Sequence, residues 1–127
     1  MTQNSNATND RIACFSVSGV DGKTTGATLI FTPTSKFTST QVTVELTTVS
    51  GFISAASFSV GSNGASYNNI LAITALTGLS TVNNYINVPI VSLSSTISAG
   101  TGIYVNVTTG ATATTYIIKV SITGFYD

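Results

Sequence analysis

The chain has 127 residues, of which only four are Lys or Arg and four are Asp or Glu; histidine is absent and the net charge is zero. The charged fraction is 6%, against roughly 25% in a typical globular chain. The composition excludes catalysis that requires histidine. It also argues against partners such as nucleic acid or an anionic membrane surface, because both are bound through clustered Lys and Arg.

The first ten residues, Met1–Asp10, are polar and show no periodicity, so we interpret them as an N-terminal arm. They have neither the basic start nor the apolar run of a signal peptide, which predicts synthesis in the cytoplasm. No apolar run approaches the roughly 18 residues of a membrane span. The whole chain is 43% hydrophobic. The length of residues 11–127 fits a single domain with its own core.

Most of this domain alternates between apolar and polar residues, which is the period of a half-buried strand. Gly, Asn and Pro separate the alternating runs, as they do at turns and strand ends. Pro89 marks an edge strand or a bulge, because proline cannot donate to the ladder. Segment 66–77 is compatible with a loop plus one short helix or strand. The predicted strands are 11–17, 27–32, 41–49, 52–60 (one bent or two short), 85–93, 103–108 and 114–126.

About eight short strands and no convincing long helix predict an all-β fold, an antiparallel β-sandwich of jelly-roll-like type. The pattern puts Val42, Val44 and Leu46 on one face of their strand. The last predicted strand is the longest, with Tyr116 and the apolar residues at every second position after it on one face. We expect the last two strands to form a hairpin across the turn at 109–111.

Residues that could carry chemistry are few and scattered. The four carboxylates lie far apart in sequence and form neither an Asp-rich calcium loop nor an evident catalytic pair. The single cysteine, Cys14, cannot form an internal disulfide, and we interpret it as a small buried residue on a strand. We therefore predict no enzymatic activity, no bound metal and no cofactor.

A surface with so few charged residues is suited to contact with other protein, which is the role that remains. Strands with few charged residues and few prolines are prone to aggregate through exposed edges, which favours an oligomer or a larger assembly that covers them. Tyrosine and phenylalanine near turns and strand ends can supply contacts, and the arm could clamp a neighbour. The candidate interface residues are Thr2, Gln3, Asn4, Tyr67, Tyr85, Tyr104, Phe125 and Tyr126.

Several stretches from Lys36 onward resemble small β-rich structural proteins of tailed bacteriophage virions: 37–44, 60–70, 74–79, 103–116 and 124–126. Such proteins decorate capsids or build fibres and baseplates, frequently as trimers with jelly-roll folds. The resemblance implies a capsid decoration (cement) protein, made in the host cytoplasm and bound to the exterior of the virion. Its implied partners are the major capsid protein and further copies of itself, as a homotrimer.

Three alternatives stay open at this point. A subunit of a tail fibre, baseplate or head appendage would contact the host surface through aromatic rings at one tip. A carbohydrate-binding sandwich module of an enzyme is disfavoured by the absence of tryptophan. A bacterial surface-layer or pilus subunit is disfavoured by the lack of an export signal.

Overall fold

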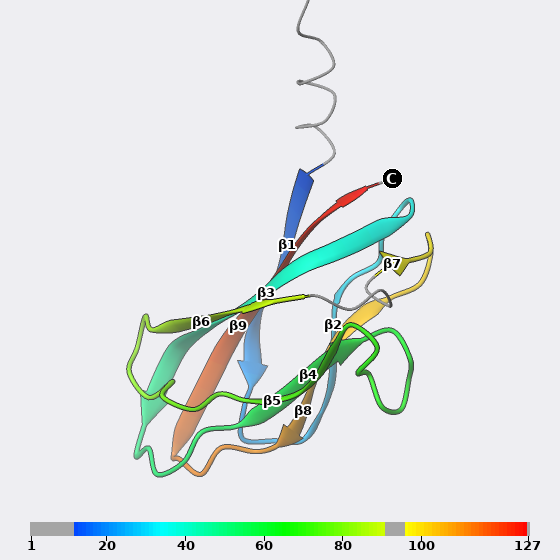
Figure 1. Cartoon of the computed structure of the whole chain (residues 1–127). Helices are drawn as coiled ribbons and strands as arrows, with labels where there is room; N and C mark the ends of the chain where they lie inside the picture. The colour runs from blue at the N-terminus through cyan, green and yellow to red at the C-terminus, as the bar shows by residue number, and fades with distance from the viewer. Residues whose placement is uncertain (1–11, 91–95, 127) are drawn as a thin grey trace, which may run out of the picture.

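Alternation of apolar and polar residues arranges the described part of the chain, residues 12–90 and 96–126, into strands that form two antiparallel sheets. This computed structural model has no helix in that part. Figure 1 shows the two layers facing each other. The strands are β1 (Ile12–Asp21), β2 (Gly26–Phe31), β3 (Phe37–Ser50), β4 (Ser57–Gly61), β5 (Leu71–Ala75), β6 (Tyr85–Pro89), β7 (Thr96–Ile97), β8 (Ile103–Thr109) and β9 (Thr115–Tyr126).

The strand order is nested. Sheet A has the order β1-β9-β3-β6, with the short β7 also on β3, and sheet B has the order β2-β8-β4-β5. The first strand thus pairs with the last, β2 with β8, β3 with β6, and β4 with β5. The predicted all-β sandwich is confirmed. We interpret the nesting as the winding of a jelly roll, in which antiparallel pairs are rolled into two packed sheets.

The core lies between the sheets and is built by every second residue of the long strands. Val42, Val44 and Leu46 of β3 are completely buried, as the alternation predicts. Tyr116 and the residues at every second position to Ile122 on β9 are buried too. Sheet B supplies the opposite wall through the buried residues of β4 and β8: Phe58, Val60, Ile103, Val105 and Val107.

Four aromatic rings, one each from β1, β2, β3 and β9, pack together. Phe15 of sheet A stacks on Phe31 of sheet B with ring centroids 3.9 Å apart and an interplanar angle of 8°. Phe37 and Tyr126 meet this pair edge to face. Offset and edge-to-face rings stabilise such contacts beyond their buried area, so this cluster joins the edge strands β1 and β2 across the sandwich.

The predicted hairpin between the last two strands is wrong. β8 pairs with β2 and β4 in sheet B, whereas β9 pairs with β1 and β3 in sheet A. The chain changes sheets between them and packs on the β1–β2 turn: Ala111 N donates to Gly22 O, and Gly22 N donates to Tyr116 O, both at 2.8 Å. Alternation identifies strands but does not choose their partners, and long-range packing decided the pairing here.

Cys14 is a second correction, because its side chain is exposed. The residues of β1 that point into the sandwich are Ala13, Phe15 and Val17, which leaves Cys14 on the uncovered face. The longest strand is β3, with 14 residues, rather than β9, with 12. The ambiguous segment 66–77 contains the short strand β5. β6 lies on the edge of sheet A, as predicted for a strand that contains proline, but it ends at Pro89 and is shorter than the predicted 85–93.

Candidate functional site

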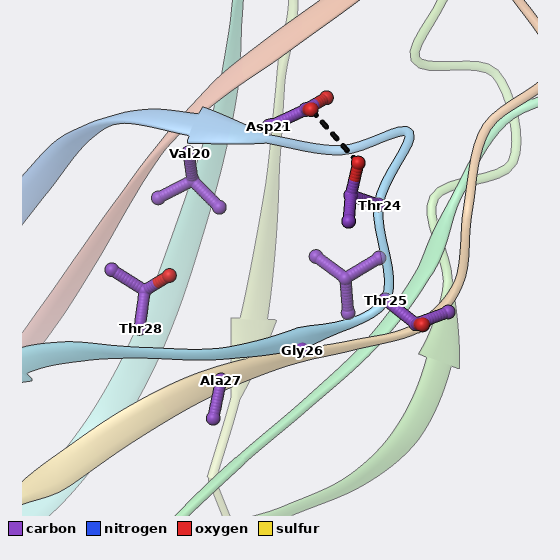
Figure 2. A pocket seen from close by; sticks show the side chains of 8 residues that line it. Val20, Asp21, Thr24, Thr25, Gly26, Ala27 and Thr28 are labelled. Carbon is purple, nitrogen blue, oxygen red and sulfur yellow. Dashed lines mark hydrogen bonds between the residues drawn. The ribbon is translucent and has the colours of Figure 1, made fainter.

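A pocket of about 280 Å³ lies between β1, the turn after it, β2 and β8. Figure 2 shows the side chains that line it. Valines and short polar residues form the walls, and Asp21 is the only lining residue that can ionise. The other polar side chains in the lining are the hydroxyls of Thr24, Thr25 and Thr28.

Asp21 stabilises the turn that follows β1. Its Oδ1 accepts a hydrogen bond from Lys23 N at 3.0 Å. Its Oδ2 accepts one from Thr24 Oγ1 at 2.9 Å, which Figure 2 shows as a dashed line. The backbone hydrogen bond from Lys23, followed by the hydroxyl of Thr24, lowers the pKa of this carboxyl. These contacts make Asp21 an Asx-type turn residue.

The part that the structure describes contains no metal-binding cluster and no membrane-spanning helix. No three His, Cys, Asp or Glu residues come together there in a way that could hold a metal ion. That part consists of strands and loops, so it has no helix that could cross a membrane.

The predicted contact aromatics lie in three different environments. Tyr67 and Tyr104 lie together on the outer side of sheet B, with ring centroids 5.0 Å apart. Tyr85, at the start of β6, is 63% exposed, and Phe125 of β9 is partly exposed on the outer face of sheet A. Tyr126 points inward to the aromatic cluster. Thr2, Gln3 and Asn4 lie outside the described residues.

The loop between β4 and β5 holds Tyr67 in place through side-chain amides. Asn63 Oδ1 accepts hydrogen bonds from Asn68 N at 2.8 Å and from Asn69 N at 3.2 Å. Asn69 in turn accepts from Ser62 N through Oδ1 and donates to Ser62 Oγ through Nδ2. Tyr67 itself has a positive φ of 48°, a strained conformation for a bulky residue that the surrounding bonds maintain.

Sequence reasoning missed several exposed apolar side chains, namely Leu29 at 44%, Ile53 at 75% and Ile73 at 65% exposure. In β2 and β5 both faces carry apolar or small residues, so alternation does not say which face is buried. The sequence did contain a signal that Leu29 is exposed. Leu29 shares a strand face with the small residue Ala27, and its neighbour Ile30 is the buried residue of β2.

Comparisons with known proteins support the fold. No protein-family model matches the chain, and no curated protein matches it. A chain of the cyanophage Pam1 capsid asymmetric unit is similar in structure, with a TM-score of 0.55 and 16% identity over 92% of this chain and 84% of that one.

Two further capsid structures contain similar chains. One is the acidic stable capsid of Helicobacter pylori bacteriophage KHP30, with a TM-score of 0.58 and 14% identity over 91% of this chain and 87% of that one. The other is the capsid of Ralstonia phage GP4, with a TM-score of 0.51 and 11% identity over 91% and 83%. The fold of this protein is therefore one found in phage capsid structures.

Proposed function

We propose that this protein is a structural component of a bacteriophage virion, a capsid decoration (cement) protein that binds the outer capsid surface and stabilises the head. The observation that carries the proposal is the shared fold with chains of three phage capsid structures, each matched over more than 80% of its own length. Those chains are thus similar in size to this one, a small β-sandwich rather than part of a much larger subunit.

The mechanism we propose is passive. Ser and Thr supply 40 of the 127 residues, and short side chains lose little rotamer freedom when an interface orders them. Many weak contacts, repeated by each copy of an oligomer, give a high overall affinity, because binding of the first copy raises the effective concentration of the next. We propose that the protein acts as a homotrimer, with the major capsid protein as its partner and without enzymatic activity.

A receptor-facing role on a tail fibre, baseplate or appendage is the alternative from the sequence. The similar chains come from structures described as capsids, which favours the head over the tail. The described pocket lends no support to the carbohydrate-binding alternative, since its lining consists of small polar and aliphatic residues without an aromatic ring.

The test uses virions of the parent phage made without this protein. Purified protein is added back, the heads are sedimented, and their melting temperature is measured with and without it. We expect the protein to co-sediment and to raise the melting temperature, and light scattering of the free protein to give the mass of three copies. Protein that stays in the supernatant would remove the decoration role.

A further inference from the structure

Formal charge is absent from the strands of sheet B in the described structure. Asp21, Glu45 and Lys119 lie on strands of sheet A, and Lys23 and Lys36 lie in the two loops that join β2 to β1 and to β3. Glu45 and Lys119 lie opposite each other in the β3–β9 register. The four strands of sheet B carry no charged residue, and neither does any residue from Leu46 to Ile118.

An uncharged face of this kind is unusual for a surface exposed to water. Surfaces of free soluble proteins typically have roughly 25–35% charged residues, of both signs. A face without ions can be buried against protein with no cost of removing charges from water. The two faces of this sandwich therefore differ in how readily each can be covered.

The outer face of sheet B also presents a row of three apolar and aromatic side chains. Leu29 of β2 lies opposite Tyr104 of β8 in the register, and the ring of Tyr67 packs on Tyr104 at 5.0 Å. Leu29 and Tyr104 flank Gly102, where an added Cβ would lie 3.0 Å from Leu29 Cδ1 and 3.1 Å from Tyr104 Cε1. We call Leu29, Tyr104 and Tyr67 the tyrosine row.

Ile73 extends this face across β5. Its neighbour Thr74 pairs with Phe58, whose side chain is buried in the core. Side chains alternate along a strand, so Ile73 points away from the core, and it is 65% exposed. The face is also organised in advance, because the asparagine bonds of the β4–β5 loop hold Tyr67. Rigid tyrosines give large contact area at little entropic cost.

We infer that the outer face of sheet B is the docking face, and that its occupant is an uncharged surface of the capsid shell. This inference rests on the proposed decoration function and deepens it by naming the side of the sandwich that meets the capsid. Charge complementarity supports the assignment, since a neutral face matches a neutral partner and would leave a charged partner unpaired. The outer face of sheet A, with Glu45 and Lys119, then faces solvent.

The experiment measures binding of the full-length protein to heads that lack it, with lysine placed on each face in turn. Leu29→Lys and Ile73→Lys put a charge on sheet B at exposed positions. Ile12→Lys and Ser16→Lys are the controls on sheet A, at two exposed positions of β1. Circular dichroism and light scattering of each free variant report its fold and its oligomeric mass.

We expect each sheet B variant to bind at least about tenfold more weakly, because its new charge is buried without a partner, while both controls stay within about twofold of the wild type. If the wild-type protein binds heads and the sheet B variants bind them equally well, the docking face is overturned and the decoration function stands. Sheet B variants that turn the free oligomer into monomers would also overturn it, since a second copy would then be the occupant. Wild-type protein that fails to bind heads would remove the decoration function itself, and the docking face with it.

Discussion

The buried hydroxyl of Tyr116 connects β9 to the loop before β6. Its ring is completely buried beneath β9, its hydroxyl donates a 2.7 Å hydrogen bond to Leu79 O in the loop before β6, and the ring of Phe52 packs on it at 6.0 Å. A buried carbonyl that loses its donor bears the full cost of its desolvation. Tyr116 is therefore the residue at which a single atom contributes most clearly to stability.

Tyr116→Phe tests this bond without changing the shape of the ring. We expect the free energy of unfolding to fall by about 1–2 kcal/mol, because Leu79 O is left without its partner. Urea denaturation measures the change. Tyr85→Phe, at an exposed ring, is the control and should stay within about 0.5 kcal/mol of the wild type. Equal stability of both variants would mean that water replaces the hydroxyl.

The same ring makes stability fall at alkaline pH. Burial raises the pKa of Tyr116 from 10.0 to about 12, so the folded state holds this proton when the unfolded state has already lost it. Stability must therefore decrease as pH rises from about 10 towards 12. Ultraviolet titration of tyrosinate should show a late ionisation step from Tyr116. That late step should be missing in Tyr116→Phe, and its persistence there would assign it to another ring.

At the scale of elements, loops rather than strands decide how the sheets are joined and what they present. The β4–β5 loop is held by Asn63 and Asn69, and the β8–β9 crossover is fitted against the β1–β2 turn. Both depend on contacts between residues whose spacing along the chain carries little pattern. Each can be weakened by one substitution that leaves the strands intact.

Asn63→Ala removes the oxygen that accepts from Asn68 N and Asn69 N. We expect a loss of about 1–2 kcal/mol in stability. Amide hydrogen exchange at residues 68 and 69 should become at least about tenfold faster, because the two amides lose their acceptor. Asn84→Ala, on the exposed loop before β6, is the control. Unchanged exchange at 68 and 69 would show that the backbone alone holds the loop.

Gly110→Ala tests the crossover between the sheets. A Cβ at this position would overlap the backbone carbonyl oxygen of Lys23, and a backbone atom cannot move aside cheaply. We expect stability to fall by about 1–3 kcal/mol, measured by thermal denaturation. Thr109→Ala, at the exposed end of β8, should change stability by less than about 0.5 kcal/mol. A stable Gly110→Ala protein would mean that the β1–β2 turn can shift as a unit.

At the scale of the whole molecule, the scarcity of charge sets how the protein responds to its solvent. Eight formal charges in 127 residues sum to zero. Interactions between exposed charges weaken when salt screens them, whereas burial of neutral surface does not. The response to salt therefore separates the neutral interface proposed here from an electrostatic one.

We expect the affinity for capsid heads to change by less than about twofold between roughly 0.05 and 0.5 M sodium chloride. Co-sedimentation at a series of salt concentrations measures it, and a decoration protein bound through ion pairs would release across the same range. A steep loss of binding with salt would contradict the uncharged docking face.

The alternating pattern was enough to predict much of this fold. Val42, Val44 and Leu46, and the alternate residues of β9, are buried as expected because side chains of a strand point alternately to its two faces. Of the predicted contact residues, Tyr67 and Tyr104 come together, Tyr85 and Phe125 lie apart from them, and Tyr126 turns inward. Whether any of them forms an interface stays a prediction.

Composition and local alternation, then, determined that the chain is an all-β sandwich with a neutral, hydroxyl-rich surface. Tertiary structure alone decided that β8 and β9 belong to different sheets, that Cys14 is exposed and that Leu29 lies beside Tyr104. The physical reason is range: alternation is a property of neighbouring residues, whereas strand partners and uncovered faces follow from contacts between residues far apart in the chain. The charge-free run from Leu46 to Ile118 was visible in the sequence, but only the pairing of β4, β5 and β8 with the equally uncharged β2 makes an uncharged face.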